Sequence, residues 1–154
     1  MRYLKVILTL LAIILALGIY TEVNAQDRYS NTELGVILGE PTGISLKAWQ
    51  SNTTAIDAAF AWSFSGNESV HIHADYLWHN WLEAETGGLN LYYGIGARVL
   101  LSDNSKAGAR IPVGLQYLIP DNRLSFFFEV APTLNVIPDT DFDVSGGLGI
   151  RLFL

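Results

Sequence analysis

The sequence has no cysteine and few basic residues: nine lysines and arginines stand against fifteen aspartates and glutamates, a formal net charge of −6. Without cysteine the chain can form neither disulfide bonds nor a thiolate metal site, so packing and hydrogen bonds must stabilise it alone. An acidic chain is repelled by the phosphates of nucleic acids, and no cluster of lysines or arginines reverses this locally. Nucleic acid is therefore excluded as a partner.

Long apolar runs are also absent, with one exception at the N-terminus. Residues 6–20 are predominantly apolar, two basic residues precede them, and "VNA" at residues 23–25 offers a cleavage site, which is the layout of a signal peptide. We expect residues 1–25 to be removed and residues 26–154 to form one barrel domain. An uncleaved anchor helix is the alternative, although the run is shorter than the roughly 20 residues that span a bilayer. No cysteine follows the run, which excludes a lipid-anchored lipoprotein.

The rest of the chain shows the alternation of β-strands. Eight segments alternate apolar side chains with polar or small ones, and none has the period of an amphipathic helix. The connections are rich in turn-forming residues and of hairpin length, so consecutive strands should pair antiparallel. The sequence predicts an all-β fold, an eight-stranded antiparallel up-and-down transmembrane β-barrel with short turns. The predicted strands are Glu33–Gly39, Ile44–Gln50, Ala55–Phe64, Ser69–His79, Leu89–Leu101, Ala109–Ile119, Leu124–Val136 and Phe142–Leu154.

Alternation alone does not decide which side of the strands faces inward. A membrane barrel turns the polar side into its lumen, whereas a soluble lipocalin-like periplasmic binding barrel, the alternative, turns it outward. The membrane is favoured because the polar side is rich in glycine and alanine, its four carboxylates match four basic side chains, and aromatic residues of the apolar side gather near strand ends. The predicted luminal polar network consists of Glu33, Lys47, Asp57, His71, His73, Asp75, Arg98, Arg110, Glu129 and Arg151.

Four stretches resemble a known family. "LGEPTGISLKAW", "LNLYYGIGARVLL", "RIPVGLQYLIPDNRLSFFFEVAPTL" and "GGLGIRLFL" are similar to small eight-stranded outer-membrane barrels with the architecture of the transmembrane domain of outer-membrane protein A. The resemblance implies a barrel in the outer membrane of a Gram-negative bacterium, surrounded by outer-membrane lipids and recognised through its C-terminal strand by the barrel-insertion machinery. It implies no known reaction. Such barrels usually end on an aromatic residue, whereas here Phe153 precedes Leu154.

The expected function follows from the filled interior. We expect a monomeric, non-enzymatic protein without cofactor, structural or a very narrow channel, whose lumen is plugged by the charged network. A lipid-modifying hydrolase or acyltransferase is the alternative, and it would need a contact between Ser69 and His71, with Asp57 or Asp75 as the acid. That side of the strand is predicted to face the lumen, away from lipid. If the N-terminus is periplasmic, the external loops are all short, which argues against an adhesin.

The stretch "HIH" has the spacing of metal ligands on a strand. His71, His73 and Asp75 occupy every second position, so their side chains share one face. A third ligand could come from Asp75 or from a neighbouring strand. However, the same face carries balanced charges in almost every strand, so a polar lumen accounts for two histidines without a metal, and no glutamate, cysteine or third histidine is placed at a spacing that closes a site unaided. We therefore expect no metal. Instead, the two histidines should bridge Asp57 and Asp75 to the arginines of the lumen.

Two prolines should interrupt the ladder of hydrogen bonds, since proline cannot donate one and a closed barrel has no edge. If Ile119 pairs with Leu124, Pro112 falls opposite about Ala131, next to Pro132. We expect a bulge or an early end of pairing there, near the outer rim of the sixth and seventh strands. A lateral gate for a lipid is the alternative interpretation.

Overall fold

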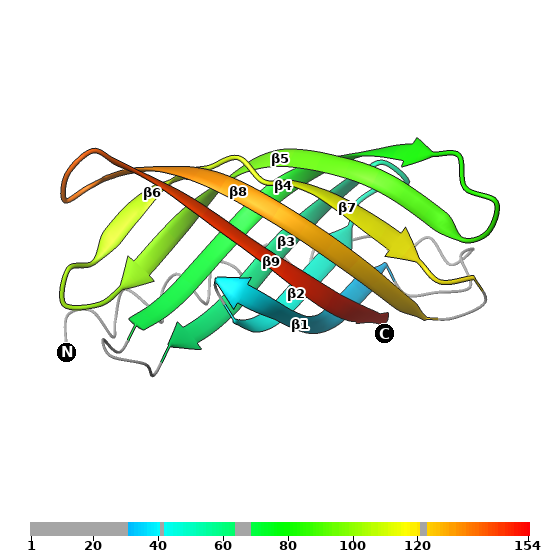
Figure 1. Ribbon diagram of the computed structural model, residues 1–154, viewed down its shortest axis with the longest axis horizontal. Coiled ribbons are helices and arrows are strands. Elements are labelled where there is room, and N and C mark those ends of the chain that lie inside the picture. Colours follow the sequence, from blue (N-terminus) through cyan, green and yellow to red (C-terminus); the bar gives the residue numbers. More distant parts are fainter. Residues whose placement is uncertain (1–30, 41, 64–68, 121–122) are drawn as a thin grey trace.

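The computed structural model describes residues 31–40, 42–63, 69–120 and 123–154. Within these ranges all regular structure is β-strand (Figure 1). No helix there is long and apolar enough to cross a membrane. The predicted signal peptide and the loop "SGNE" lie outside the described residues. The strands are β1 (Thr32–Glu40), β2 (Gly43–Trp49), β3 (Thr54–Ser63), β4 (Ser69–Leu82), β5 (Gly88–Leu101), β6 (Lys106–Arg110), β7 (Val113–Leu118), β8 (Leu124–Ile137) and β9 (Asp141–Phe153).

The nine strands close into a ring with eight strand positions. Neighbouring strands pair antiparallel, and β1 also pairs with β9, so the first and last strands close the sheet. β6 and β7 share one position, because both pair with β5 on one side and with β8 on the other. Figure 1 shows the long strands crossing the molecule at a tilt. The predicted antiparallel ring of eight is confirmed, with its sixth strand divided in two.

The division between β6 and β7 falls at Ile111 and Pro112, and both pieces keep one register against their neighbours. The backbone N–H of Ile111 donates to the carbonyl of Pro132 at 2.9 Å, and that of Gly94 donates to the carbonyl of Pro112 at 2.9 Å. In a hydrogen-bonded antiparallel pair, each of the two opposite residues normally donates its N–H to the carbonyl of the other, but proline has no N–H. Each proline therefore removes one of two bonds, in two adjacent ladders.

The predicted interruption is present, but its form differs from the expectation. Regular pairing stops at Arg110 and resumes at Val113 in the same register, without a bulge, because the remaining bond of each pair holds the register, and β8 runs unbroken through Pro132. The gap lies between two strand pieces of the same position and not at the rim. The register shift between β6 and β8 falls elsewhere, between Ala107 and Gly108.

The ring turns its charged side chains inward and its large apolar side chains outward. Glu33 is fully buried, whereas its neighbour Leu34 is 42 % exposed, and the same alternation recurs along the other strands. A soluble barrel has the opposite arrangement. The interior also contains a nonpolar cluster that the sequence analysis did not single out, formed by Ile37, Leu77, Tyr92 and Phe127.

Glycines on the inner side of the sheet make room for large side chains of the neighbouring strand. A Cβ atom on Gly149 would lie 2.1 Å from the ring of Phe127. A Cβ atom on Gly114 would lie 2.3 Å from the ring of Tyr92. The interior is therefore packed across strand pairs, with a large side chain on one strand lying over a glycine on the next.

Gly149→Ala should lower the free energy of unfolding by about 1–3 kcal/mol, the usual cost of overpacking a filled interior. The added methyl group would meet the Phe127 ring and, 2.6 Å away, the carbonyl oxygen of Val36. Urea titration of the refolded barrel measures the loss. Gly146→Ala in the same strand is the matched control, because the nearest atom to a Cβ there lies 3.3 Å away. Equal stability of the two variants would contradict this packing.

Candidate functional site

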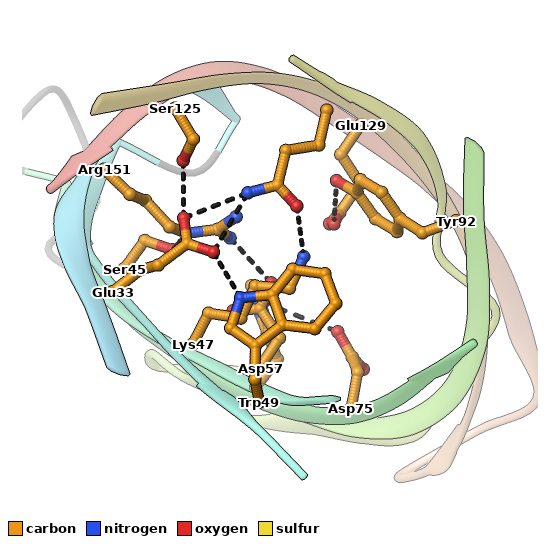
Figure 2. A network of polar contacts seen from close by, with 12 residues as sticks. Glu33, Ser45, Lys47, Trp49, Asp57, Asp75, Tyr92, Ser125, Glu129 and Arg151 are labelled. Atoms are coloured by element: carbon orange, nitrogen blue, oxygen red, sulfur yellow. Dashed lines mark hydrogen bonds and ion pairs between the residues drawn. The ribbon is translucent and has the colours of Figure 1, made fainter. Parts of the chain in front are cut away.

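The ten side chains predicted to form the luminal network all lie inside the ring, and none is more than 9 % exposed. They come from all eight strand positions, because inward side chains recur at every second residue of a strand. Figure 2 shows six of them, Glu33, Lys47, Asp57, Asp75, Glu129 and Arg151, projecting into the interior from different walls of the ring. Burying an ion without a partner is strongly unfavourable. The arrangement of partners therefore decides what this site can do.

Arg151 of β9 connects three strands through its guanidinium group. Its Nη2 donates to Oδ2 of Asp57 in β3 at 2.6 Å, and its Nε donates to Oγ of Ser45 in β2 at 2.9 Å. The group also lies over the Phe127 ring, 3.7 Å from the ring centroid. The ion pair thus joins β9 to β3, which are separated in the sheet by β1 and β2. A planar cation with several donors suits such a position better than an ammonium group.

Arg110 of β6 lies between two carboxylates. Its Nη2 donates to Oε1 of Glu129 in β8, and its Nε lies 3.2 Å from Oδ2 of Asp75 in β4. Tyr92 of β5 donates its hydroxyl hydrogen to the other oxygen of Glu129 at 2.9 Å (Figure 2). Glu129 therefore has one charged and one neutral partner, and the four side chains link β4, β5, β6 and β8.

Glu33 and Lys47 are joined through the side-chain amide of Gln116. Lys47 Nζ donates to Gln116 Oε1 at 2.7 Å, and Gln116 Nε2 donates to the two Glu33 oxygens at 2.9 and 3.1 Å. Trp49 Nε1 and Ser125 Oγ also donate to Glu33, each at 2.5 Å. Neither Glu33 nor Lys47 forms a direct ion pair within the described ranges. The four carboxylates and four basic side chains balance in number, but Glu33 and Lys47 meet only through neutral partners, because Gln116 lies between the two charges.

Arg98 forms an ion pair with Asp143, a carboxylate that the predicted network does not include. Its Nη2 donates to Asp143 at 2.5 Å and to Asn135 at 2.9 Å, and Asn135 donates in turn to Asp143 at 2.8 Å. Lys106 lies 3.8 Å from Asp143 and donates to Asp141 at 2.6 Å. The Asp143 side chain is 36 % exposed. This cluster therefore reaches water, unlike the ion pairs of Arg151 and Arg110.

The two histidines of "HIH" do not bridge carboxylates to arginines, so that expectation is wrong. Nε2 of His73 lies 3.8 Å from Oδ2 of Asp75, beyond hydrogen-bond distance, and the His71 ring meets the His73 ring edge-on with centroids 5.6 Å apart. The arginines reach the carboxylates directly because their side chains are longer. Nε2 of His71 and Nδ1 of His73 are left without a hydrogen-bond partner among the described residues.

Several interior residues are missing from the predicted network, although their positions carry the signal. Each is an even number of residues from a predicted member of the same strand position, which puts both on the inner side. A neutral or aromatic side chain is compatible with either side, so alternation alone does not assign most of them to the network. Gln116 falls on the predicted polar side but carries no charge, and Asp143 lies near the end of its strand. The missed residues are Ser45, Trp49, His79, Asn90, Tyr92, Gln116, Ser125, Thr133, Asn135 and Asp143.

The contact required by the lipid-modifying alternative is not formed. Ser69 is the first residue of β4 and lies opposite Ser63 of β3. In the part of the chain that the structure describes, no hydrogen bond joins Ser69 to His71. A nucleophile, a base and an orienting acid are therefore not assembled at this place.

Comparison with known proteins bears on the fold. No protein-family model and no curated protein matches the chain. Among solved structures, the chain is similar to the N-terminal β-barrel domain of Pseudomonas aeruginosa OprF, with a TM-score of 0.59 and 11 % sequence identity, covering 82 % of this chain and 100 % of that one. At this identity the likeness shows the fold alone. The architecture expected from the resemblance, a small barrel of the outer-membrane protein A type, is thereby confirmed.

Glu129→Ala should lower the free energy of unfolding by about 3–5 kcal/mol, because it leaves the buried Arg110 without its hydrogen-bonded carboxylate. Urea titration of the refolded protein measures the change. The matched control is Val130→Ala, the next residue along β8, whose side chain points outward. The control should lose clearly less stability, and an equal loss would show that the ion pair contributes nothing.

Arg98→Ala should lower the free energy of unfolding less than Glu129→Ala does, as measured by the same urea titration. The Asp143 carboxylate that it leaves behind is partly exposed, so water can solvate its charge. A loss from Arg98→Ala as large as that from Glu129→Ala would contradict the difference in burial between the two ion pairs.

Proposed function

We propose that this protein is a bacterial outer-membrane β-barrel without enzymatic activity, which acts as a structural element of the membrane or as a very narrow channel. Residues 26–154 form the barrel as a monomer, after removal of the signal peptide at residues 1–25. Its partners are outer-membrane lipids and, during insertion, the machinery that recognises the C-terminal strand. No cofactor is needed for this role.

The observation that carries the proposal is the apolar outer surface of the ring. Leu38, Ile95 and Phe142 each expose more than half of their surface, and similar side chains follow one another around the sheet. An apolar surface of this extent is rare on a protein that lives in water. The hydrocarbon of a bilayer solvates it, and a closed ring leaves no unpaired strand edge in the lipid. A soluble lipocalin-like barrel would require the opposite burial.

The contents of the interior favour a closed or very narrow lumen. Eight strands leave an interior just wide enough for side chains. Here two ion pairs lie inside it. The Arg151–Asp57 pair joins β9 to β3, which are not adjacent in the sheet, and the Arg110–Glu129 pair joins the neighbouring strands β6 and β8. Such cross-links support a rigid structural part. If the barrel acts as a channel, only small species can pass between these side chains.

The outer membrane is the location that the comparison supports. The fold shared with the OprF N-terminal β-barrel domain extends over all of that domain. The signal-peptide layout of residues 1–25 supports export across the inner membrane. Both observations agree with the outward apolar surface.

The native protein should require detergent for extraction from membranes and should migrate faster on gels before boiling than after it. A closed, hydrogen-bonded barrel resists dodecyl sulfate until heat unfolds it. Cell fractionation followed by electrophoresis of boiled and unboiled samples tests this. Recovery of the folded chain as a soluble periplasmic protein would overturn the proposal.

Reconstitution in planar bilayers tests the closed lumen. The wild-type protein should show no steady conductance of the size given by open porins, because the side chains and ion pairs of the interior block the passage of hydrated ions. The matched control is the same bilayer with a large porin reconstituted by the same procedure. A steady conductance on the nanosiemens scale from the wild-type barrel would contradict the closed lumen.

A further inference from the structure

We propose that His73, Asp75 and Glu129 form a binding site for a divalent transition-metal ion such as Zn²⁺, for which Arg110 competes. The inference concerns the folded ring alone and does not depend on the membrane role proposed above.

The three side chains meet at one place in the interior. Each offers one ligand atom, these atoms all lie within 4.8 Å of one another, and no member of the triad is more than 5 % exposed. Two ligand atoms at about 2.0–2.2 Å from one tetrahedral zinc ion are about 3.3–3.6 Å apart, so the longest separation in the triad must shorten by roughly 1 Å when the ion binds. Nε2 of His73 and Oδ2 of Asp75, at 3.8 Å, are already close to this distance.

The third ligand comes from a different part of the chain. His73 and Asp75 are two residues apart on the inner side of β4, whereas Glu129 belongs to β8. The sequence predicts no metal because a polar lumen accounts for the histidines and because no third ligand lies at a spacing that closes the site unaided. Closure of the ring brings Glu129 to the pair, so the second of these reasons does not hold.

Several buried polar atoms at this place have unused hydrogen-bonding capacity, as do some others elsewhere in the interior. Neither oxygen of Asp75 accepts a hydrogen bond, and Nδ1 of His73 and Nε2 of the adjacent His71 also have no partner within the described chain. Buried polar atoms are normally bonded, so several such atoms around one point need an explanation. A metal ion accepts lone pairs from carboxylates and imidazoles alike.

Arg110 is the group that the ion must displace. Its Nη2 holds Glu129 and its Nε lies 3.2 Å from Asp75, but neither Nε nor Nη1 makes a hydrogen bond. The guanidinium neutralises one of the two carboxylate charges, whereas a divalent ion matches both. The two cations therefore compete for the same two carboxylates, and removal of Arg110 should favour the metal.

The mixed ligand set selects the class of ion. One imidazole with two carboxylates suits zinc and its first-row neighbours. Mg²⁺ and Ca²⁺ prefer six or more oxygen ligands, which this triad does not provide. The site should therefore discriminate against both of these ions.

Calorimetric titration of Zn²⁺ into the refolded barrel tests the proposal. The wild type should bind one ion with a dissociation constant of about 10 µM or below. His73→Ala should weaken binding by more than about 100-fold, a loss larger than the roughly 10–100-fold of a supporting contact. His79→Ala is the matched control, because His79 is equally buried on the inner side of β4 but lies outside the triad. Mg²⁺ should give no binding heat.

Arg110→Gln provides the second test, and it should bind Zn²⁺ at least about tenfold more tightly than the wild type because the competing charge is gone. Mobility of unboiled samples on gels checks that each variant is folded. Co²⁺ added to the wild type should give visible ligand-field absorption, a readout that needs no variant. Absence of saturable Zn²⁺ binding by the wild type, or equal weakening by His73→Ala and His79→Ala, would overturn the site. Unchanged affinity in Arg110→Gln would overturn the competition.

Discussion

A ring of eight strands leaves an interior just wide enough for side chains, and this shortage of space determines most of what the structure contains. Large inward side chains lie over glycines of the next strand, as Phe127 does over Gly149. Charged side chains in the same interior are cut off from bulk water, so each needs a partner from another strand. The small residues and the charged residues of the inner side are therefore two results of one constraint.

The alternation of side chains made the strands and the inward residues predictable, because strand geometry alone decides on which side a residue lies. The choice of partners was not predictable in the same way. Asp57 lies directly opposite Lys47 in the sheet, yet its ion pair is with Arg151 from β9. Because the strands tilt around the ring, side chains from distant strands meet in the interior, and sequence spacing does not contain that information.

The way in which two neighbouring carboxylates are neutralised was likewise not predictable from sequence spacing. Asp57 and Asp75 are directly opposite each other in β3 and β4, a pairing that is destabilising when it is left alone. Each carboxylate has a different arginine beside it, Arg151 for one and Arg110 for the other. The form of the gap at the prolines was not predictable either. The sequence shows which two residues lack an N–H, but not which neighbouring strand each missing N–H would have faced.

The contacts that fill the interior also constrain the order in which the chain can assemble. The bonds from Arg151 to Asp57 and from Ser125 to Glu33 join residues 94 and 92 positions apart. Hairpins such as β8 with β9 close short loops and can form early, whereas contacts of such separation require the entropy of a long loop to be lost first. A partly assembled sheet therefore keeps these ions in contact with solvent, and they lose it together when β1 meets β9. Final closure is thus expected to be a cooperative step, in which strand pairing and ion pairing gain their energy at the same moment.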